Sequence, residues 1–193
     1  MLVSYNRFIG SPVMSLQTGS ELARTNRVLV DPRDLTVVAY ELEGPMLSEH
    51  PSFIRILDIR EFSNIGIIID SSDEFVGLDD VIKLKEVYDF HFDLVGLKVV
   101  DKRGRKLGKV SGYTIDSDSF VVQQLSVQRP LLQSFNETEL LINRSQIVEL
   151  SDQQVIVEDG SQVVSDREPV RNYTNPFRQS AQPEAITSQT PRD

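Results

Sequence analysis

The chain has 193 residues, with 20 lysine and arginine residues against 29 aspartate and glutamate residues, which gives a formal net charge of −9. It contains no cysteine and only two histidines, so disulfides, thiolate metal sites and a cysteine nucleophile are excluded and a histidine-rich zinc site is disfavoured. The acidic balance argues against a protein that wraps nucleic acid non-specifically, and the lack of a long apolar run argues against a membrane-spanning helix.

The composition changes along the chain and suggests five segments. They are an N-terminal extension at 1–11, a first repeat at 12–76, a connecting segment at 77–93, a second repeat at 94–159 and a tail at 160–193. The N-terminal extension lacks the basic start and apolar stretch of a secretory signal, so we expect a cytoplasmic protein. The tail is polar, rich in proline and without an apolar period, so we predict that it is disordered. Its aromatic residues, Tyr173 and Phe177, either have no role or form a docking motif for a partner.

An internal repeat relates the two halves of the chain. Adding 85 to the residue number maps Gly19 onto Gly104, and after an insertion of three residues an offset of 88 maps 67–70 onto 155–158. The identity between the halves is low, but their apolar positions and glycines agree over nearly sixty residues. We therefore predict a duplicated structural unit.

Each copy has the pattern of a β structure, with short segments rich in valine and isoleucine between turn residues. In the second copy the predicted strands cover residues 99–100, 109–116, 120–127, 139–142 and 155–158. Short helical turns are predicted at 56–62 and 143–150. A helix is favoured at 79–88 in the connecting segment, although the alternation of Ile82 and Leu84 also fits a strand. Five or six short antiparallel strands per copy predict a small closed or nearly closed barrel. We therefore expect a mainly β protein with two tandem antiparallel β-barrels, packed together because each is small for independent stability.

Glycine and aspartate mark the predicted turns. Gly19 and Gly104 supply the positive φ of a hairpin turn, and Gly108 allows a sharp bend where a small barrel closes. Asp31 and Asp116 each open a turn, because an aspartate side chain can accept a hydrogen bond from the backbone of the turn. We expect these five residues to have structural roles.

The sequence from 96 to 116 contains a strand, a hairpin with Gly104, the pair Leu107 and Gly108, a second strand and a turn with Asp116. This order resembles the opening of the PRC-barrel family, and the resemblance covers 12–76 and 94–159, with Ala23 in the place of Gly108 in the first copy. The family includes the carboxy-terminal domain of the ribosome maturation factor RimM and the cytoplasmic domain of the photosynthetic reaction centre H subunit. The resemblance implies a non-catalytic module that binds or supports other macromolecules, including a role in ribosome assembly.

Positive charge is concentrated on one predicted hairpin of the second copy. The first repeat has 5 basic and 11 acidic residues, and the second has 8 basic and 9 acidic residues. Six of the eight basic residues lie around this hairpin: Lys98, Lys102, Arg103, Arg105, Lys106 and Lys109. They either form a solvated turn that protects an edge strand from pairing or contact an anionic partner, such as ribosomal RNA or an acidic protein face. No aromatic residue interleaves with them, so stacking on single-stranded bases has little support.

The chain contains no calcium-loop spacing, no glycine-rich nucleotide loop and no nucleophile elbow, so we expect no metal ion, no cofactor and no small-molecule substrate. We predict a non-enzymatic binding or assembly module with a protein or ribonucleoprotein partner and no membrane contact. One alternative is a self-assembling structural protein that uses exposed apolar barrel faces. The other is an acid–base enzyme that uses carboxylates such as Asp31 and Asp116.

Overall fold

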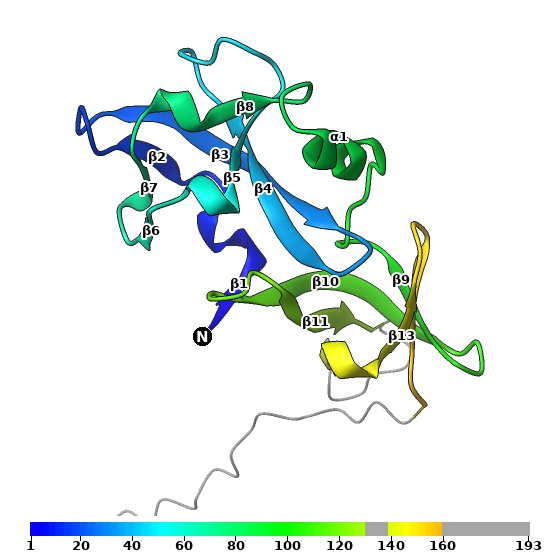
Figure 1. Ribbon diagram of the computed structural model, residues 1–193. Helices are drawn as coiled ribbons and strands as arrows, with labels where there is room; N and C mark the ends of the chain where they lie inside the picture. Colours follow the sequence, from blue (N-terminus) through cyan, green and yellow to red (C-terminus); the bar gives the residue numbers. More distant parts are fainter. Residues whose placement is uncertain (130–138, 160–193) are drawn as a thin grey trace, which may run out of the picture.

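The computed structural model describes residues 1–129 and 139–159, which form a mainly β structure (Figure 1). The strands belong to two seven-stranded sheets, and each sheet is built largely from one half of the chain. We call residues 12–77 the first unit and residues 98–157 the second unit. The predicted disordered tail at 160–193 lies outside the described residues.

One strand order is common to the two sheets. The first sheet has the order β6-β7-β2-β3-β4-β5-β8, and the second has the order β13-β14-β9-β10-β11-β12, with β1 added beside β10. The strands of the first sheet are β2 (Pro12–Ser15), β3 (Glu21–Asp31), β4 (Thr36–Glu43), β5 (Ser52–Arg55), β6 (Glu61–Ser63), β7 (Gly66–Ile69) and β8 (Phe75–Gly77). Those of the second sheet are β1 (Leu2–Ser4), β9 (Lys98–Asp101), β10 (Lys106–Asp116), β11 (Val122–Gln128), β12 (Glu139–Asn143), β13 (Ile147–Leu150) and β14 (Gln154–Val157). Strands β2 to β7 therefore correspond to β9 to β14, as expected of a duplicated unit.

Irregularities in the strands also recur at the offset of 85. The first sheet has three places and the second has four at which one strand has an extra residue, which is the pattern of a β-bulge, and the fourth place in the second sheet is Val148 on β13. Three places of the second sheet match those of the first. The extra residues form equivalent pairs: Leu22 and Leu107, Asn26 and Ser111, and Val38 and Gln123. Bulges bend a strand and increase its twist, so the long strands β3 and β10 curl around the apolar side chains of their own unit.

The sheets differ from the predicted antiparallel barrels in two respects. One strand pair in each sheet is parallel, β2 with β7 and β9 with β14, because the chain makes a hairpin with β6 or β13 before it returns beside the first strand. Hydrogen bonding closes neither sheet within the described residues, since β6 and β8 are the ends of one sheet and β12 and β13 are the ends of the other. The predicted helical turns are also shorter, at Ile56–Asp58 and Arg144–Gln146, because strands β6 and β13 follow closely.

A glycine allows two strands to approach closely in each unit. This glycine is on β10 in the second unit and directly follows β4 in the first. Gly108 on β10 has a φ of +155°, and a Cβ atom there would lie 2.2 Å from the Gln128 carbonyl oxygen on β11. In the first unit Ala23 takes the place of Gly108, and Gly44, just after β4, has a φ of +157°. A Cβ atom at Gly44 would lie 3.3 Å from the Ala23 Cα atom. Each unit therefore keeps one glycine at this close approach.

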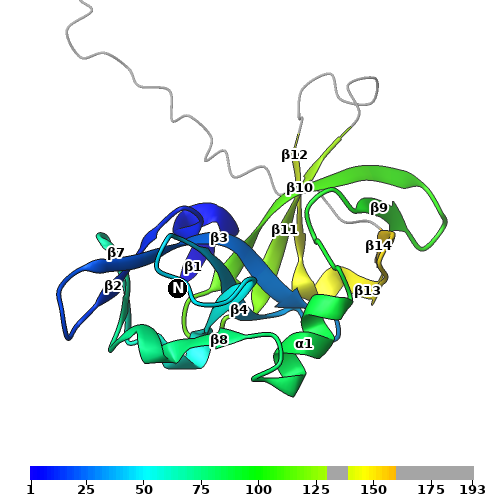
Figure 2. The same ribbon diagram turned by 90° about the horizontal axis from the view of Figure 1, so that it is seen from above.

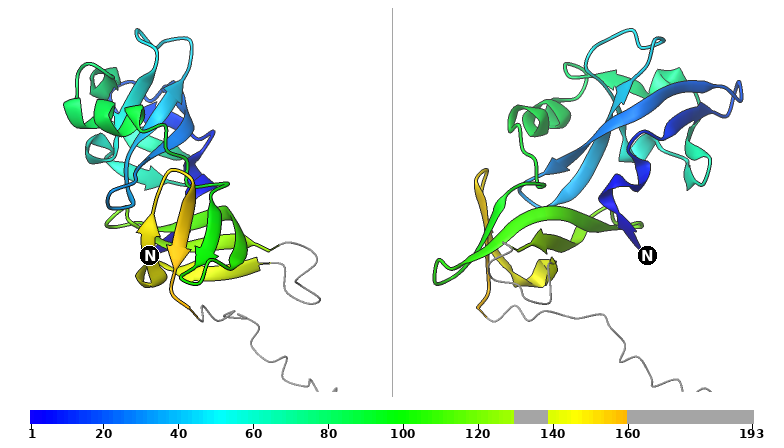
Figure 3. Two further views of the ribbon diagram at one scale, coloured as in Figure 1. Left: turned by 90° about the vertical axis from the view of Figure 1, so that its right-hand side faces the viewer. Right: turned by 180° about the vertical axis from the view of Figure 1, so that it is seen from behind.

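The two units meet through equivalent residues. Leu35 and Phe120, which are 85 positions apart, end the turns after β3 and β10, with φ values of +58° and +55°. The Val37 N–H donates to the Phe120 carbonyl at 2.8 Å, and the Val122 N–H donates to the Leu35 carbonyl at 2.9 Å. The two units thus exchange matching hydrogen bonds, as two subunits do in an isologous dimer. Figure 3 shows the two units from two further sides, the first in blue to cyan and the second in green to orange.

A common hydrophobic core lies under this contact and includes buried side chains of both units. Phe62 is at the junction, with its ring centroid 5.0 Å from that of Phe120 and 4.7 Å from that of Phe8. The ring of Tyr40, which is almost fully buried, lies 6.3 Å from Phe62. Because a unit of about 65 residues buries little apolar surface alone, sharing a core stabilises both units.

Helix α1 (Ile82–Asp89) forms in the connecting segment, where the sequence predicts a helix, and lies against the first sheet (Figure 2). Leu84 and Val87 are buried against Leu29, Ala39 and Phe53 of that sheet. Among the described residues α1 is the only α-helix, so the second sheet has no α-helix in the corresponding place. The N-terminal extension instead contributes β1, which pairs with the end of β10.

Candidate anion-binding site

The hairpin with the six predicted cations consists of β9, β10 and the turn between them, at the far end of the second unit (Figure 1). Lys98 lies directly opposite Lys109, and Lys106 lies opposite Val100. The three lysines are exposed, whereas the intervening Val99 is fully buried. Because side chains alternate along a strand, the lysines project from the outer face of the sheet.

Strands β9 and β10 both lie inside the sheet, in the order β14-β9-β10-β11. Protection of an edge strand, which was one of the two explanations of the basic residues, therefore does not account for Lys98 on β9 or for Lys106 and Lys109 on β10. The glycine of the adjacent turn, Gly104, has a φ of +78°, and its counterpart Gly19 has a φ of +67°.

Three of the six cations form ion pairs close to the turn. The pairs are Lys102 with Glu158 at 2.7 Å, Arg103 with Asp159 at 2.7 Å, and Arg105 with Asp101 at 2.5 Å. Burial raises the pKa of the Asp101 carboxyl, but hydrogen bonds from Arg105 and from the Arg103 backbone outweigh burial and hold that pKa below its ordinary value. These three cations are thus neutralised by acidic groups of the same chain.

The other three cations, Lys98, Lys106 and Lys109, line a hollow of about 680 Å³. Its other lining residues are Val99, Val100, Gly108, Gln128, Arg129 and Gln154. The Nε atom of Arg129 is buried and has no hydrogen-bond partner among the residues that the structure describes. No acidic side chain is among the described residues that line the hollow, and none of its lysines forms an ion pair with a described residue. The described lining therefore brings together four positive charges and no negative charge.

Arg129 is the member of this group that the sequence analysis missed. It lies 20 positions after Lys109 in the sequence, and the count of charges around the hairpin did not include it. The feature that could have revealed Arg129 is the pairing of β10 with β11. This pairing places Gln128 opposite Lys109 and brings Arg129 to the same end of the sheet. Extending the predicted strand at 120–127 by one residue, to the end of β11, reveals this proximity.

The first unit has a hollow at the equivalent place, with a volume of about 490 Å³. Its residues and their counterparts at the offset of 85 are Glu21 and Lys106, Arg24 and Lys109, Glu43 and Gln128, and Gly44 and Arg129. Arg24 forms an ion pair with Glu21 at 2.8 Å. The equivalent surfaces therefore have opposite charge, with two carboxylates and one guanidinium in the first unit and four cations in the second.

The two turn aspartates are held by local hydrogen bonds and lie in different turns. Asp31, which is 2% exposed, accepts bonds from the backbone N–H and the guanidinium of Arg33. Asp116 accepts bonds from the N-terminal ammonium group and from the Ser119 hydroxyl and backbone N–H. The Arg33 side chain lowers the pKa of Asp31, and the ammonium group lowers the pKa of Asp116. A general acid requires a raised pKa, so this geometry does not favour the carboxylate enzyme.

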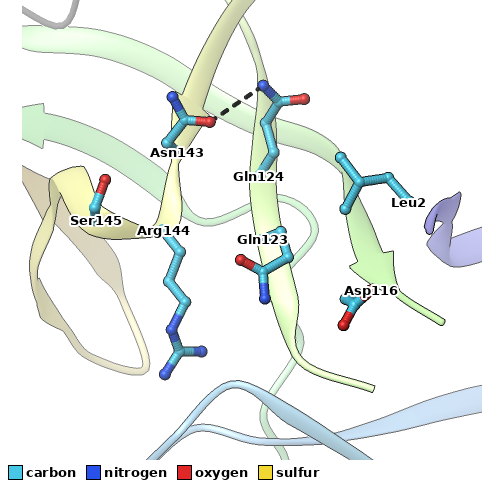
Figure 4. Close-up of a pocket in the computed structure, with 7 residues that line it drawn as sticks. All are labelled: Leu2, Asp116, Gln123, Gln124, Asn143, Arg144 and Ser145. Atoms are coloured by element: carbon cyan, nitrogen blue, oxygen red, sulfur yellow. Dashed lines mark hydrogen bonds between the residues drawn. The ribbon is translucent and has the colours of Figure 1, made fainter. Parts of the chain in front are cut away.

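A polar hollow of about 700 Å³ lies on the second unit beside β11 (Figure 4). Gln124 donates a hydrogen bond to Asn143, and Arg144 donates to the Asp34 carbonyl of the first unit at 2.7 Å. Figure 4 shows Gln123 between Arg144 and Asp116. Because Arg144 and Asp116 already have partners within the chain, this hollow is a weaker candidate than the one beside β9.

The equivalent hollow of the first unit is also about 700 Å³ but is mainly apolar. It has Val38, Ile56 and Leu57 where the second unit has Gln123, Arg144 and Ser145. Leu57 is 90% exposed. Chemical character thus differs between the units at both equivalent hollows.

Among the described residues, no group of three or more histidine, cysteine, aspartate or glutamate side chains could hold a metal ion. No helix in that part of the chain is long and apolar enough to span a membrane. No protein family profile matches the sequence, and no curated protein matches it.

Proposed function

We propose that the chain is a tandem PRC-barrel-like protein that acts as a non-enzymatic binding module and contacts an anionic protein or ribonucleoprotein through its second unit. The observation that carries the proposal is a group of four cations beside β9, none of which forms an ion pair with a described residue, together with the absence of such a group from the equivalent hollow of the first unit. Two units with one strand order support the tandem arrangement. The strongly bulged long strands support a barrel-like curvature.

The arrangement of the lysines favours a contact over simple solvation. Like charges that lie directly opposite each other on neighbouring strands are destabilising, and Lys98 and Lys109 lie in this way. An anionic partner would relieve their repulsion when it binds. The acidic first unit would repel the same partner, so it would direct the contact to the second unit.

A pull-down of the full chain from native lysate, in RNase-treated and untreated arms, tests this function. The test variant is Lys98→Glu with Lys109→Glu, and the control is Lys102→Glu with Arg103→Glu, which makes the same change of net charge on the same hairpin. We expect the wild type and the control to retain a specific partner and the test variant to lose it. A partner lost on RNase treatment is held through RNA, and one that survives is a protein. Equal retention by the test variant contradicts the proposal, as does the absence of a specific partner in both arms.

Self-assembly is the second candidate function, and the apolar hollow of the first unit favours it. An exposed apolar surface next to the junction of the units could bind another copy of the chain. Sedimentation over a wide range of protein concentration tests this candidate. It requires an oligomer that Leu57→Glu dissociates, and a monomer at all concentrations contradicts it.

A further inference from the structure

We propose that the hollow beside β9 and β10 is a binding site for phosphoryl groups, with Lys98, Lys109 and Arg129 as the residues that contact the phosphate oxygens. This inference rests on the proposed function and names the chemistry of the anion. It distinguishes phosphate oxygens from the carboxylates of an acidic protein face.

Positive charge converges on the hollow beside β9 and β10. Residues directly opposite each other on antiparallel strands have Cβ atoms about 5 Å apart, so the side chains of Lys98 and Lys109 can reach one anion. Lys106, on the same face, and Arg129 bring the hollow to four cations. A carboxylate and a nucleic-acid phosphodiester each have one negative charge and two free oxygens, whereas a terminal phosphate presents three free oxygens and about −1.5 to −2 charges. A terminal phosphate therefore neutralises more of this charge with one group, and a nucleic-acid backbone does so with several closely spaced groups.

The Nε atom of Arg129 is buried and lacks a hydrogen-bond partner within the described part of the chain. A buried polar atom without a hydrogen bond destabilises the fold, so a native structure usually provides it with a partner. The planar guanidinium group presents its N–H donors in a fork that matches phosphate oxygens, and lysine adds charge without fixed direction. The hollow thus combines one directional donor group with three mobile cations.

The rest of the lining is neutral. Gln128 and Gln154 contribute amide groups that can donate to oxygen, and Val99, Val100 and Gly108 also line the hollow. No acidic side chain among the described lining residues would repel phosphate.

The absence of aromatic residues from the described lining bears on the source of the phosphoryl group. Without an aromatic side chain on which a base can stack, the site would contact the phosphates of a nucleic acid and not its bases. Binding to a nucleic acid would therefore be independent of sequence and sensitive to salt. The phosphoryl group could come from a nucleic-acid backbone or from a small phosphorylated molecule. The recognition chemistry is the same for both sources.

Fluorescence anisotropy with a labelled short RNA duplex, followed by competition with inorganic pyrophosphate and with polyglutamate, tests the inference on the full chain. We expect Lys98→Glu with Lys109→Glu to weaken RNA binding at least about tenfold and to reduce the slope of log affinity against log salt by about 2. Arg129→Gln weakens binding severalfold, whereas the control Lys102→Glu with Arg103→Glu has a smaller effect. Circular dichroism and thermal melting verify that each variant is folded.

The competition distinguishes the two sources of the phosphoryl group. It also separates the phosphoryl site from the proposed contact with an anionic partner. Displacement of RNA by pyrophosphate indicates a small phosphorylated ligand, and resistance to pyrophosphate indicates a polymer backbone. Binding of polyglutamate at least as tight as binding of RNA overturns the phosphoryl site but leaves the proposed anionic contact intact. Failure to bind either RNA or pyrophosphate also overturns the inference, and the pull-down then decides separately whether the proposed function survives.

Discussion

The two units have one architecture and two surface chemistries. They have the same strand order, bulges at the same offset and matching hydrogen bonds at their junction. Their equivalent hollows differ, with Glu21, Arg24 and Glu43 in the first unit and Lys106, Lys109 and Arg129 in the second. Features that maintain the fold are thus repeated, while the features that could select a partner are not.

Because of this difference, the first unit can serve as a control for the second. A residue of the first unit lies at the same position in the fold as its counterpart, so the effects of substitutions at the two positions can be compared directly. The overall charge of −9 also has a clearer meaning, because the acidic first unit accounts for much of it. A local contact with an anion through the second unit is compatible with that charge.

The largest expected effects concern two aromatic rings, Phe62 at the junction of the units and Phe53 under α1. We predict that Phe62→Ala lowers the free energy of unfolding by about 3 kcal/mol, since its ring fills the junction beside Phe8 and Phe120. The control Phe53→Ala removes a ring that packs under α1 within the first unit and costs about 4 kcal/mol. Amide hydrogen exchange distinguishes the two variants. Phe62→Ala should accelerate exchange in both units and Phe53→Ala mainly in the first, and unchanged exchange in the second unit of Phe62→Ala would contradict a shared core.

The next effect concerns the glycine of each unit. Gly108→Ala should lower the free energy of unfolding by about 3 kcal/mol, because its Cβ atom would overlap the Gln128 carbonyl at a strained φ. Gly44→Ala should cost about 1–2 kcal/mol, since the nearest atom would be 3.3 Å away. Ala23→Gly, the control, should cost about 1 kcal/mol or less. Urea unfolding measures all three, and equal costs for Gly108→Ala and Ala23→Gly would refute this account of the close approach.

The smallest effect concerns the turn aspartates and depends on pH. The pKa of Asp31 is lowered in the folded state, so its stabilisation is present above the unfolded pKa of about 3.9 and is lost as the pH falls through the folded value. We predict that Asp31→Asn costs about 1–2 kcal/mol at neutral pH, and that the difference from the wild type shrinks below about pH 4. Asp116→Asn should cost less, because its carboxylate is 28% exposed. A pH-independent difference for Asp31→Asn in thermal melts would argue against the ionised turn.

Local patterns predicted much of the fold, and long-range pairing explains the rest. Alternation of apolar and polar residues, and glycines at turns, indicated the strands and the repeat because these signals act within a few residues. The parallel pairs and the open sheet ends escaped prediction because they depend on which distant strands pair, and β7 and β14 have only four residues each.

The same distinction applies to the candidate site. The hairpin lysines were evident from the sequence because they are neighbours in it. Arg129 was missed since cross-strand register brings it to Lys109, and the ion pairs of Lys102 and Arg103 were missed since Glu158 and Asp159 lie more than fifty positions away. Separating free cations from paired cations therefore required the tertiary structure.

The most direct test of the central claim is a map of backbone amide chemical shifts in the full ¹⁵N-labelled chain during titration with pyrophosphate. An anion contact through the second unit predicts shifts that saturate and gather around Lys98, Lys109 and Arg129, with little change around Arg24 and Glu43. Lys98→Glu with Lys109→Glu should abolish those shifts. Equal perturbation of both units, or no saturable shift in the second, would contradict the claim.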